Sequence, residues 1–207
     1  RMPRDRLIDS FGRVIDNIRI SVTDRCNFRC RYCMPEAGMI WLDHAEILTY
    51  EEIERLVRIL VGMGISKARL TGGEPLMRKE LPSLVQRLAG IEGLNDIALT
   101  TNGHFLAEQA GSLARAGLRR INVSLDSLDP ATFEAMARRN YLDRVLAGIE
   151  AAHECGLGPL KLNVVLIRGV NDGEIAGFAQ LARTRPFVVR FIEFMPIGSD
   201  DGWSNDR

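Results

Sequence analysis

Three of the four cysteines in this chain, Cys26, Cys30 and Cys33, fall within eight residues. Thiolates at offsets of four and three on a tight loop can each bind a different iron of one cube-shaped iron–sulfur cluster. Such a cluster ordinarily takes four cysteine ligands, so three leave one iron free to bind a small molecule. The spacing therefore predicts a [4Fe–4S] cluster whose open iron is a site of chemistry.

Two other interpretations of these cysteines are a zinc site and plain packing. Structural zinc takes four ligands, usually as two pairs, and no second pair or histidine partner stands nearby in the sequence. Buried free cysteines are common, but the loop around these three is rich in Arg and Asn. The fourth cysteine, Cys155, follows an amphipathic stretch and precedes Gly156, which favours a structural or incidental role.

The residues around the cysteines also match a known family. Tyr32 precedes the last cysteine, and residues 19–35 read RISVTDRCNFRCRYCMP. This stretch resembles the CxxxCxxC signature of radical S-adenosylmethionine enzymes, and more narrowly the GTP 3′,8-cyclases of molybdenum cofactor biosynthesis. The resemblance implies a lyase in which S-adenosylmethionine binds the open iron, takes one electron and gives a 5′-deoxyadenosyl radical. It further implies hydrogen abstraction from C3′ of GTP and closure onto C8 of guanine.

A second motif, Gly72-Gly73-Glu74-Pro75, directly follows a predicted strand. The glycines permit close backbone approach to the methionine end of S-adenosylmethionine, and Glu74 can accept from its ammonium group. Alone, a turn of this composition is weak evidence for a binding site, and it becomes strong evidence together with the cysteine loop. The resemblance adds four contacts with S-adenosylmethionine, from Tyr32, Gly73, Ser124 and Met195. The alternative for Ser124 is a satisfied hydroxyl, and for Met195 a core side chain.

Three cations, Arg19, Arg69 and Lys161, share one face of the predicted strands. An unpaired inward cation costs several kcal/mol in desolvation, so these residues need an anion. Arginine can clamp a phosphate with two bonds and lysine supplies a point charge, which suits a triphosphate. Pairing with Asp126 or Glu193 inside the protein is the alternative. The resemblance favours GTP and adds Thr100 as a further contact.

Strand and helix patterns alternate along the chain. Ile18, Ile20 and Val22 alternate with polar residues, and Thr49 with Glu52 forms a capping box before a helix that ends near Gly62. Six strand-then-helix units predict a parallel sheet with right-handed crossovers. The predicted strands are 17–23, 67–71, 96–101, 120–126, 160–167 and 187–194. The other predicted helices are 79–89, 105–116, 141–155, 173–184 and a short one beginning at Asp129-Pro130.

The two faces of these strands differ in polarity. One is aliphatic, whereas the other carries polar residues in each strand, ending with Glu193 and Met195. A doubly wound sheet is buried on both faces and has nearly continuous apolar strands, which is not the pattern here. The sequence therefore predicts an α/β fold, a partial (β/α)6 TIM-type barrel with parallel strands, as the resemblance also implies. Its site should lie at the carboxyl ends of the strands.

Length and composition indicate the class of protein. We expect residues 1–207 to form one radical S-adenosylmethionine barrel domain, with residues 1–16 as an extension and without the C-terminal cluster-binding segment of the family. Lys plus Arg and Asp plus Glu both number 27, which argues against nucleic acid or a membrane as partner. No signal peptide is recognisable, and clustered cysteines suit a reducing compartment, so we expect a cytoplasmic protein.

The implied partners are GTP as substrate and an electron donor for the cluster, with a homodimer left open. Two other functions stay open on the residues alone. A different radical S-adenosylmethionine enzyme acting on a peptide or metabolite would keep the cysteine loop and change the cations. A non-catalytic iron–sulfur module would keep the cluster and leave its ligand intact.

Overall fold

The computed structural model describes residues 6–195 of the 207. Its centre is one parallel sheet in which each strand pairs with the next strand along the chain, in the order β1-β2-β3-β4-β5-β6. A doubly wound sheet reverses its strand order at a switch point, and this sheet does not. The partial six-stranded barrel is thus confirmed. The strands are β1 Asn17–Ser21, β2 Lys67–Thr71, β3 Asp96–Thr101, β4 Arg120–Ser124, β5 Leu160–Leu166 and β6 Phe187–Glu193.

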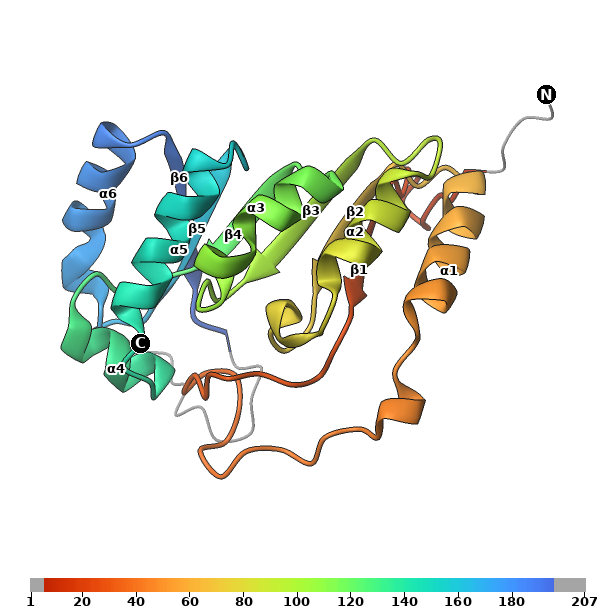
Figure 1. Cartoon of the computed structure of the whole chain (residues 1–207). Helices are drawn as coiled ribbons and strands as arrows, with labels where there is room; N and C mark the ends of the chain where they lie inside the picture. The colour runs from red at the N-terminus through yellow and green to blue at the C-terminus, as the bar shows by residue number, and fades with distance from the viewer. Residues whose placement is uncertain (1–5, 196–207) are drawn as a thin grey trace.

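The crossover helices lie on one side of the sheet (Figure 1). They cover the aliphatic strand face predicted from the sequence, and Leu70, Leu99, Val123 and Leu162 on that face are fully buried. The core therefore lies between sheet and helices, and the polar face is left open. None of the helices in residues 6–195 combines the length and apolarity needed to cross a membrane. The helices are α1 Tyr50–Gly62, α2 Leu81–Ala89, α3 Leu106–Ala116, α4 Pro130–Ala137, α5 Leu142–Glu154 and α6 Ile175–Thr184.

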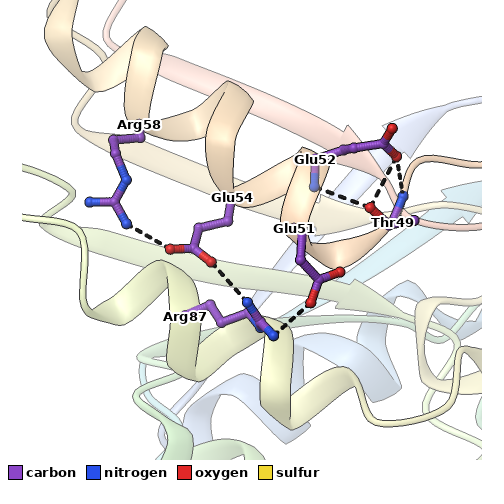
Figure 2. A network of polar contacts seen from close by, with 6 residues as sticks. All are labelled: Thr49, Glu51, Glu52, Glu54, Arg58 and Arg87. Carbon is purple, nitrogen blue, oxygen red and sulfur yellow. Dashed lines mark hydrogen bonds and ion pairs between the residues drawn. The ribbon is translucent and has the colours of Figure 1, made fainter.

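Helix α1 begins where the capping box predicted. The Thr49 hydroxyl accepts from the Glu52 amide at 3.2 Å, and the Thr49 amide donates to the Glu52 carboxylate at 2.7 Å (Figure 2). Arg87 of α2 contacts Glu51 at 2.6 Å and Glu54 at 3.1 Å, which joins α2 to α1. Exposed ion pairs of this kind contribute about 0–1 kcal/mol each, so the buried apolar face supplies most of the attachment.

Other helix starts and ends follow local chemistry as well. Asp129 caps α4, since its carboxylate accepts from the Thr132 amide at 2.8 Å and Pro130 occupies the first helical position. Strands β5 and β6 each end one residue earlier than predicted, and two strands end two residues early: β1 at Ser21 and β4 at Ser124. At both points the chain leaves the ladder to enter a loop at the carboxyl end of the sheet, which is where the candidate site lies.

The sequence pattern predicts the wrong polar face for the last strand, β6. The register places Asn163 of β5 opposite Arg190 and Leu166 opposite Glu193. Arg190 therefore belongs to the polar face, and Glu193 to the face that the helices cover. The stretch Phe187–Glu193 is mostly apolar, so its own pattern does not reveal which residues face inward, and pairing with β5 decides it. Met195 follows the strand and is 49% exposed.

Candidate functional site

The three clustered cysteines lie in a loop at the carboxyl end of β1. This cysteine loop, residues 24–34, runs past the ends of the strands and reaches α4 (Figure 1). The Cys33 amide donates to the Cys30 carbonyl at 2.9 Å, so a tight turn connects these two cysteines. The Cys26 sulfur already has two donors near it, the Phe28 amide at 3.4 Å and the Asn102 side chain at 3.9 Å.

Burial keeps the three thiols protonated in the ligand-free loop. Desolvation raises the pKa of Cys26, Cys30 and Cys33 above its ordinary value. The thiols also lie close enough to affect each other, because a charge on Cys33 raises the pKa of both Cys26 and Cys30. Binding to iron would have to displace these protons, and the metal would then neutralise the charge that burial disfavours.

The predicted Gly-Gly-Glu turn after β2 is joined to the cysteine loop by backbone hydrogen bonds. The Gly73 amide donates to the Thr23 carbonyl and the Glu74 amide to the Arg25 carbonyl, both at 2.7 Å. A β-carbon at Gly73 would lie 2.4 Å from the carbonyl oxygens of Asp24 and Arg25, closer than any side chain tolerates. Glycine is therefore required here so that the two loops can touch. Its predicted contact with S-adenosylmethionine stays a prediction.

The Glu74 carboxylate faces inward and bonds the next loop along the sheet. One oxygen accepts from the Thr101 hydroxyl at 2.6 Å and the Leu76 amide at 3.0 Å, and the other from the Asn102 amide at 2.6 Å. Glu74 is 1% exposed, and this burial raises its pKa to about 7. These contacts link the loops that follow β2 and β3. The predicted bond from Glu74 to an ammonium group is not tested by them.

Tyr32 reaches across the sheet end to a buried acid. Its hydroxyl donates to Asp126 at 2.5 Å, and the other Asp126 oxygen accepts from the Val165 amide at 2.9 Å. Burial raises the pKa of Asp126 to about 6 and that of Tyr32 well above its ordinary value. Both residues line a small hollow of about 20 Å³ together with Cys30 and Ser124. The structure thus brings two of the predicted S-adenosylmethionine contacts, Tyr32 and Ser124, next to the cysteine loop.

A larger pocket of about 330 Å³ opens on the polar face of the sheet. Three arginines from three strands line it, Arg19 of β1, Arg69 of β2 and Arg190 of β6, together with Thr100 of β3. Lys161 of β5 lies near these arginines. Desolvation lowers its pKa most, and the charges of Arg190, Arg120 and Arg69 lower it further. The predicted gathering of cations on this face is confirmed, and Arg190 is the member that sequence reasoning missed.

No acid inside the described part of the chain neutralises the predicted cations. The side chains of Arg19, Arg69 and Lys161 make no hydrogen bond or ion pair with any residue from 6 to 195. The Asp126 carboxylate, one of the two acids weighed as a partner, is bonded to Tyr32 and the Val165 amide instead. Desolvation, followed by repulsion from neighbouring arginines, lowers the pKa of Arg69. The pocket is thus built for an anion.

Unpaired buried polar atoms mark the same region. Within residues 6–195, five buried side-chain atoms have no hydrogen-bond partner. Three belong to the cysteine loop and one to the cationic pocket, and the fifth belongs to a histidine whose ring lies 6.3 Å from that of Phe28. Buried polar groups are ordinarily bonded, so such a concentration indicates a place where a ligand supplies the partners. The atoms are Asp24 Oδ1, Arg25 Nε, Asn27 Nδ2, Arg69 Nε and His104 Nδ1.

Comparison with known families agrees with this geometry. The profile described as "Radical SAM superfamily" matches residues 20–182, and the chain belongs to this superfamily. It is 53% identical over 199 residues to the GTP 3′,8-cyclase of Geobacter sulfurreducens, a match that covers 96% of the chain and 61% of that protein. It is 52% identical over 200 residues to the GTP 3′,8-cyclase of Acidothermus cellulolyticus, covering 94% of the chain and 55% of that protein. The chain thus spans less than two thirds of these relatives.

Solved structures share the fold at low sequence identity. Streptococcus suis SuiB bound to S-adenosylmethionine superposes with a TM-score of 0.74 at 15% identity, over 90% of this chain and 42% of SuiB. Methylornithine synthase superposes with a TM-score of 0.72 at 20% identity, over 92% of this chain and 57% of that enzyme. At these identities the likeness concerns the fold alone, and it confirms a barrel-type arrangement.

Membership of the superfamily implies a [4Fe–4S] cluster and S-adenosylmethionine as cofactors, and the cysteine loop fits a cluster better than a single ion. In the described ranges, no three His, Cys, Asp or Glu side chains gather around one metal position. The ligands of a single tetrahedral ion must converge on one point, whereas a cube takes each thiolate on a different iron. The cysteine thiols affect one another's pKa without converging on one point, and unpaired polar atoms lie beside them. Both features suit a cluster better than a single ion.

Proposed function

We propose that this chain is the catalytic barrel of a GTP 3′,8-cyclase, which cyclises GTP to 3′,8-cyclo-7,8-dihydroguanosine 5′-triphosphate in molybdenum cofactor biosynthesis. Two independent observations support the proposal. Relatives of that name are 52–53% identical over almost the whole chain. The observation that carries it is the pocket of about 330 Å³ with arginines that have no acidic partner among the described residues.

In this proposal the cationic pocket holds the triphosphate. Arg19 and Arg69 clamp phosphate oxygens with their paired N–H groups, and Lys161 adds a point charge. Arg190 is oriented in advance, because its guanidinium donates to Asn163 Oδ1 at 3.0 and 2.6 Å. The Thr100 hydroxyl accepts from the Asn122 side-chain Nδ2 at 3.3 Å and keeps its own proton for a phosphate oxygen.

The cysteine loop and its neighbours hold the cofactors. We assign Cys26, Cys30 and Cys33 to the cluster, and Tyr32, Gly73, Glu74, Ser124 and Met195 to S-adenosylmethionine. When bound, the cluster and S-adenosylmethionine supply a one-electron cleavage that provides a radical able to abstract hydrogen. The chain contributes position. The bonds of Gly73, Glu74 and Asn102 join the loops that follow β1, β2 and β3, so the cysteine loop and the Gly-Gly-Glu turn are held together.

The proposed reaction takes its electron from a separate donor. We place the protein in the cytoplasm, where its four free cysteines stay reduced. A homodimer is compatible with this assignment. Neither nucleic acid nor a membrane is needed as a partner.

Nucleotide binding tests the proposal directly. If the cations hold the phosphates, titration calorimetry should give affinities in the order GTP, GDP, GMP. Loss of one charged hydrogen bond costs about 1.5–3 kcal/mol, so each phosphate removed should weaken binding roughly tenfold or more. Binding should also weaken as salt rises, because part of the pocket is open to solvent. GMP that binds as tightly as GTP would show that the cations do not serve the phosphates.

A further inference from the structure

The end of helix α4 holds the cysteine loop through its backbone. The Arg29 amide donates to the Ala137 carbonyl at 3.2 Å, and the Arg31 amide donates to the Met136 carbonyl at 3.0 Å. The last carbonyls of a helix have no partner within the helix and need one from outside. Here the cysteine loop supplies that partner. Two segments more than a hundred residues apart in sequence therefore pair at the site.

Two arginines that follow α4 complete this attachment. The Arg138 guanidinium donates to the carbonyls of Arg29 and Met34, both at 3.3 Å. The Arg139 guanidinium donates to the Asn27 carbonyl at 3.1 Å. Each of the three carbonyls that they bind belongs to a residue directly next to a cysteine in the sequence.

The backbone at this point is itself unusual. Arg138 has a φ of 54°, in the left-handed region that residues with a side chain seldom adopt. This conformation ends α4 and turns the chain, so that Arg138 and Arg139 both reach the cysteine loop. The acid nearest to Arg138 is Glu36, which is largely exposed and 3.9 Å away, so the ion pair contributes little. The loop carbonyls are the closer partners.

Apolar packing on the same side fixes the floor beneath the loop. The Phe28 ring lies edge-on to Phe133 of α4 at 6.0 Å and beside Tyr141 at 5.9 Å. Phe28 itself is 3% exposed. The ring anchors one side chain of the loop, and the arginines anchor its carbonyls. The shape of the loop is thus set from outside, since the loop has no helix or strand of its own.

We propose that Arg138 and Arg139 are positioning residues of the cysteine loop, which hold the carbonyls of Asn27, Arg29 and Met34 so that the thiols are arranged for a cluster before iron arrives. This inference rests on the proposed function for the identity of the cluster. The guanidinium group suits the task because its planar array of donors can bind several carbonyls at fixed angles. Neither arginine touches the substrate pocket.

Amide hydrogen exchange on the metal-free chain tests the inference without any cofactor. The double variant Arg138→Gln with Arg139→Gln keeps much of each side chain and removes the charged donors. We expect the Arg29 and Arg31 amides to exchange about tenfold faster or more, because bonds to charged groups are among the stronger ones. The amides of β3 should not change. Equal exchange at Arg29 and Arg31 in variant and parent would overturn the proposal.

A matched control is Arg119→Gln. Arg119 is exposed, precedes β4 at the opposite end of the sheet, and its side chain bonds no residue in the described part of the chain. It should leave exchange in the cysteine loop unchanged. If the double variant does not fold, as circular dichroism would show, the single variant Arg139→Gln replaces it, with Arg139→Lys as its conservative partner. Lysine keeps one charged donor for the Asn27 carbonyl, so the Arg29 and Arg31 amides should exchange faster in Arg139→Gln than in Arg139→Lys, and equal rates in the two would overturn the proposal.

Cluster assembly gives a second measurement. After anaerobic reconstitution with iron and sulfide, the double variant should bind iron more slowly than the parent and Arg139→Lys should recover most of the rate. A variant that binds iron at the parental rate would contradict the proposal. If the parent binds no iron, the proposed function fails, and the exchange experiment still decides whether the arginines position the loop.

Discussion

Replacing Arg69 should separate the stability of this chain from its affinity for nucleotide. In Arg69→Met the stem of the side chain is kept and the guanidinium is removed. The Arg69 Nε is buried without a partner, and neighbouring arginines repel the group. An unsatisfied buried donor costs about 1–3 kcal/mol, so its removal should stabilise the ligand-free chain. One kcal/mol corresponds to roughly 2–4 °C in Tm for a chain of this size, which sets the expected rise.

Nucleotide affinity should move in the opposite direction. Loss of a charged bond to phosphate costs about 1.5–3 kcal/mol, so the Kd for GTP should rise about 10- to 150-fold. Thermal unfolding without ligand and titration calorimetry with GTP measure the two effects on one preparation. Groups that bind ligand but lower the stability of the ligand-free chain are typical of functional sites. A rise in Tm together with a loss of GTP affinity would identify Arg69 as such a group.

Arg120→Met is the matched control for this experiment. Arg120 lies on the same sheet but has an acidic partner, with its Nε 2.9 Å from Asp96. Removing it should therefore lower Tm, and GTP affinity should fall much less than in Arg69→Met. If Arg69→Met lowers the Tm of the ligand-free chain, Arg69 has a structural partner and is not kept for an anion. If GTP affinity stays unchanged in Arg69→Met, the guanidinium does not bind the phosphates.

Two further predictions concern other groups. Burial raises the pKa of Glu74 to about 7 from an ordinary 4.5, so its contribution to stability is present below pH 4.5 and is lost as pH rises through 7. Between these pH values, the unfolding free energy of the parent should fall by about 3 kcal/mol more than that of Glu74→Gln, measured by denaturant titration; equal slopes would contradict the buried acid. Cys155→Ala should keep the visible absorbance of the reconstituted cluster and Cys26→Ala should lose it, whereas equal loss would overturn the ligand assignment.

The fold could be predicted from sequence because its signals are local. Alternation of aliphatic and polar residues fixed both faces of β1 to β5, and the Thr49 and Asp129 caps fixed the starts of α1 and α4. The last strand was different. Phe187–Glu193 is nearly continuous in apolar residues, so only its pairing with β5 shows that Arg190 and not Glu193 faces the pocket.

The site was predictable in composition but not in its bonds. The cysteine spacing and the inward cations were evident because residue type and position along a strand suffice to see them. The Tyr32–Asp126 bond joins residues 94 positions apart, and Arg139 bonds Asn27 across 112 positions. No local pattern encodes such pairs. The inward turn of Glu74 could not be foreseen either, because it depends on the Thr101 hydroxyl and Asn102 amide of the next strand end.

We propose above all that the cysteine loop holds a cluster with an open iron, which this barrel uses to cleave S-adenosylmethionine. The most direct measurement is 5′-deoxyadenosine formed by the anaerobically reconstituted chain with S-adenosylmethionine and dithionite, quantified by chromatography beside Cys33→Ala. We predict that the parent forms 5′-deoxyadenosine and that Cys33→Ala forms none. A parent that carries its full iron yet forms no 5′-deoxyadenosine would contradict the claim and indicate an iron–sulfur module, and equal amounts from both chains would contradict the three-thiolate site.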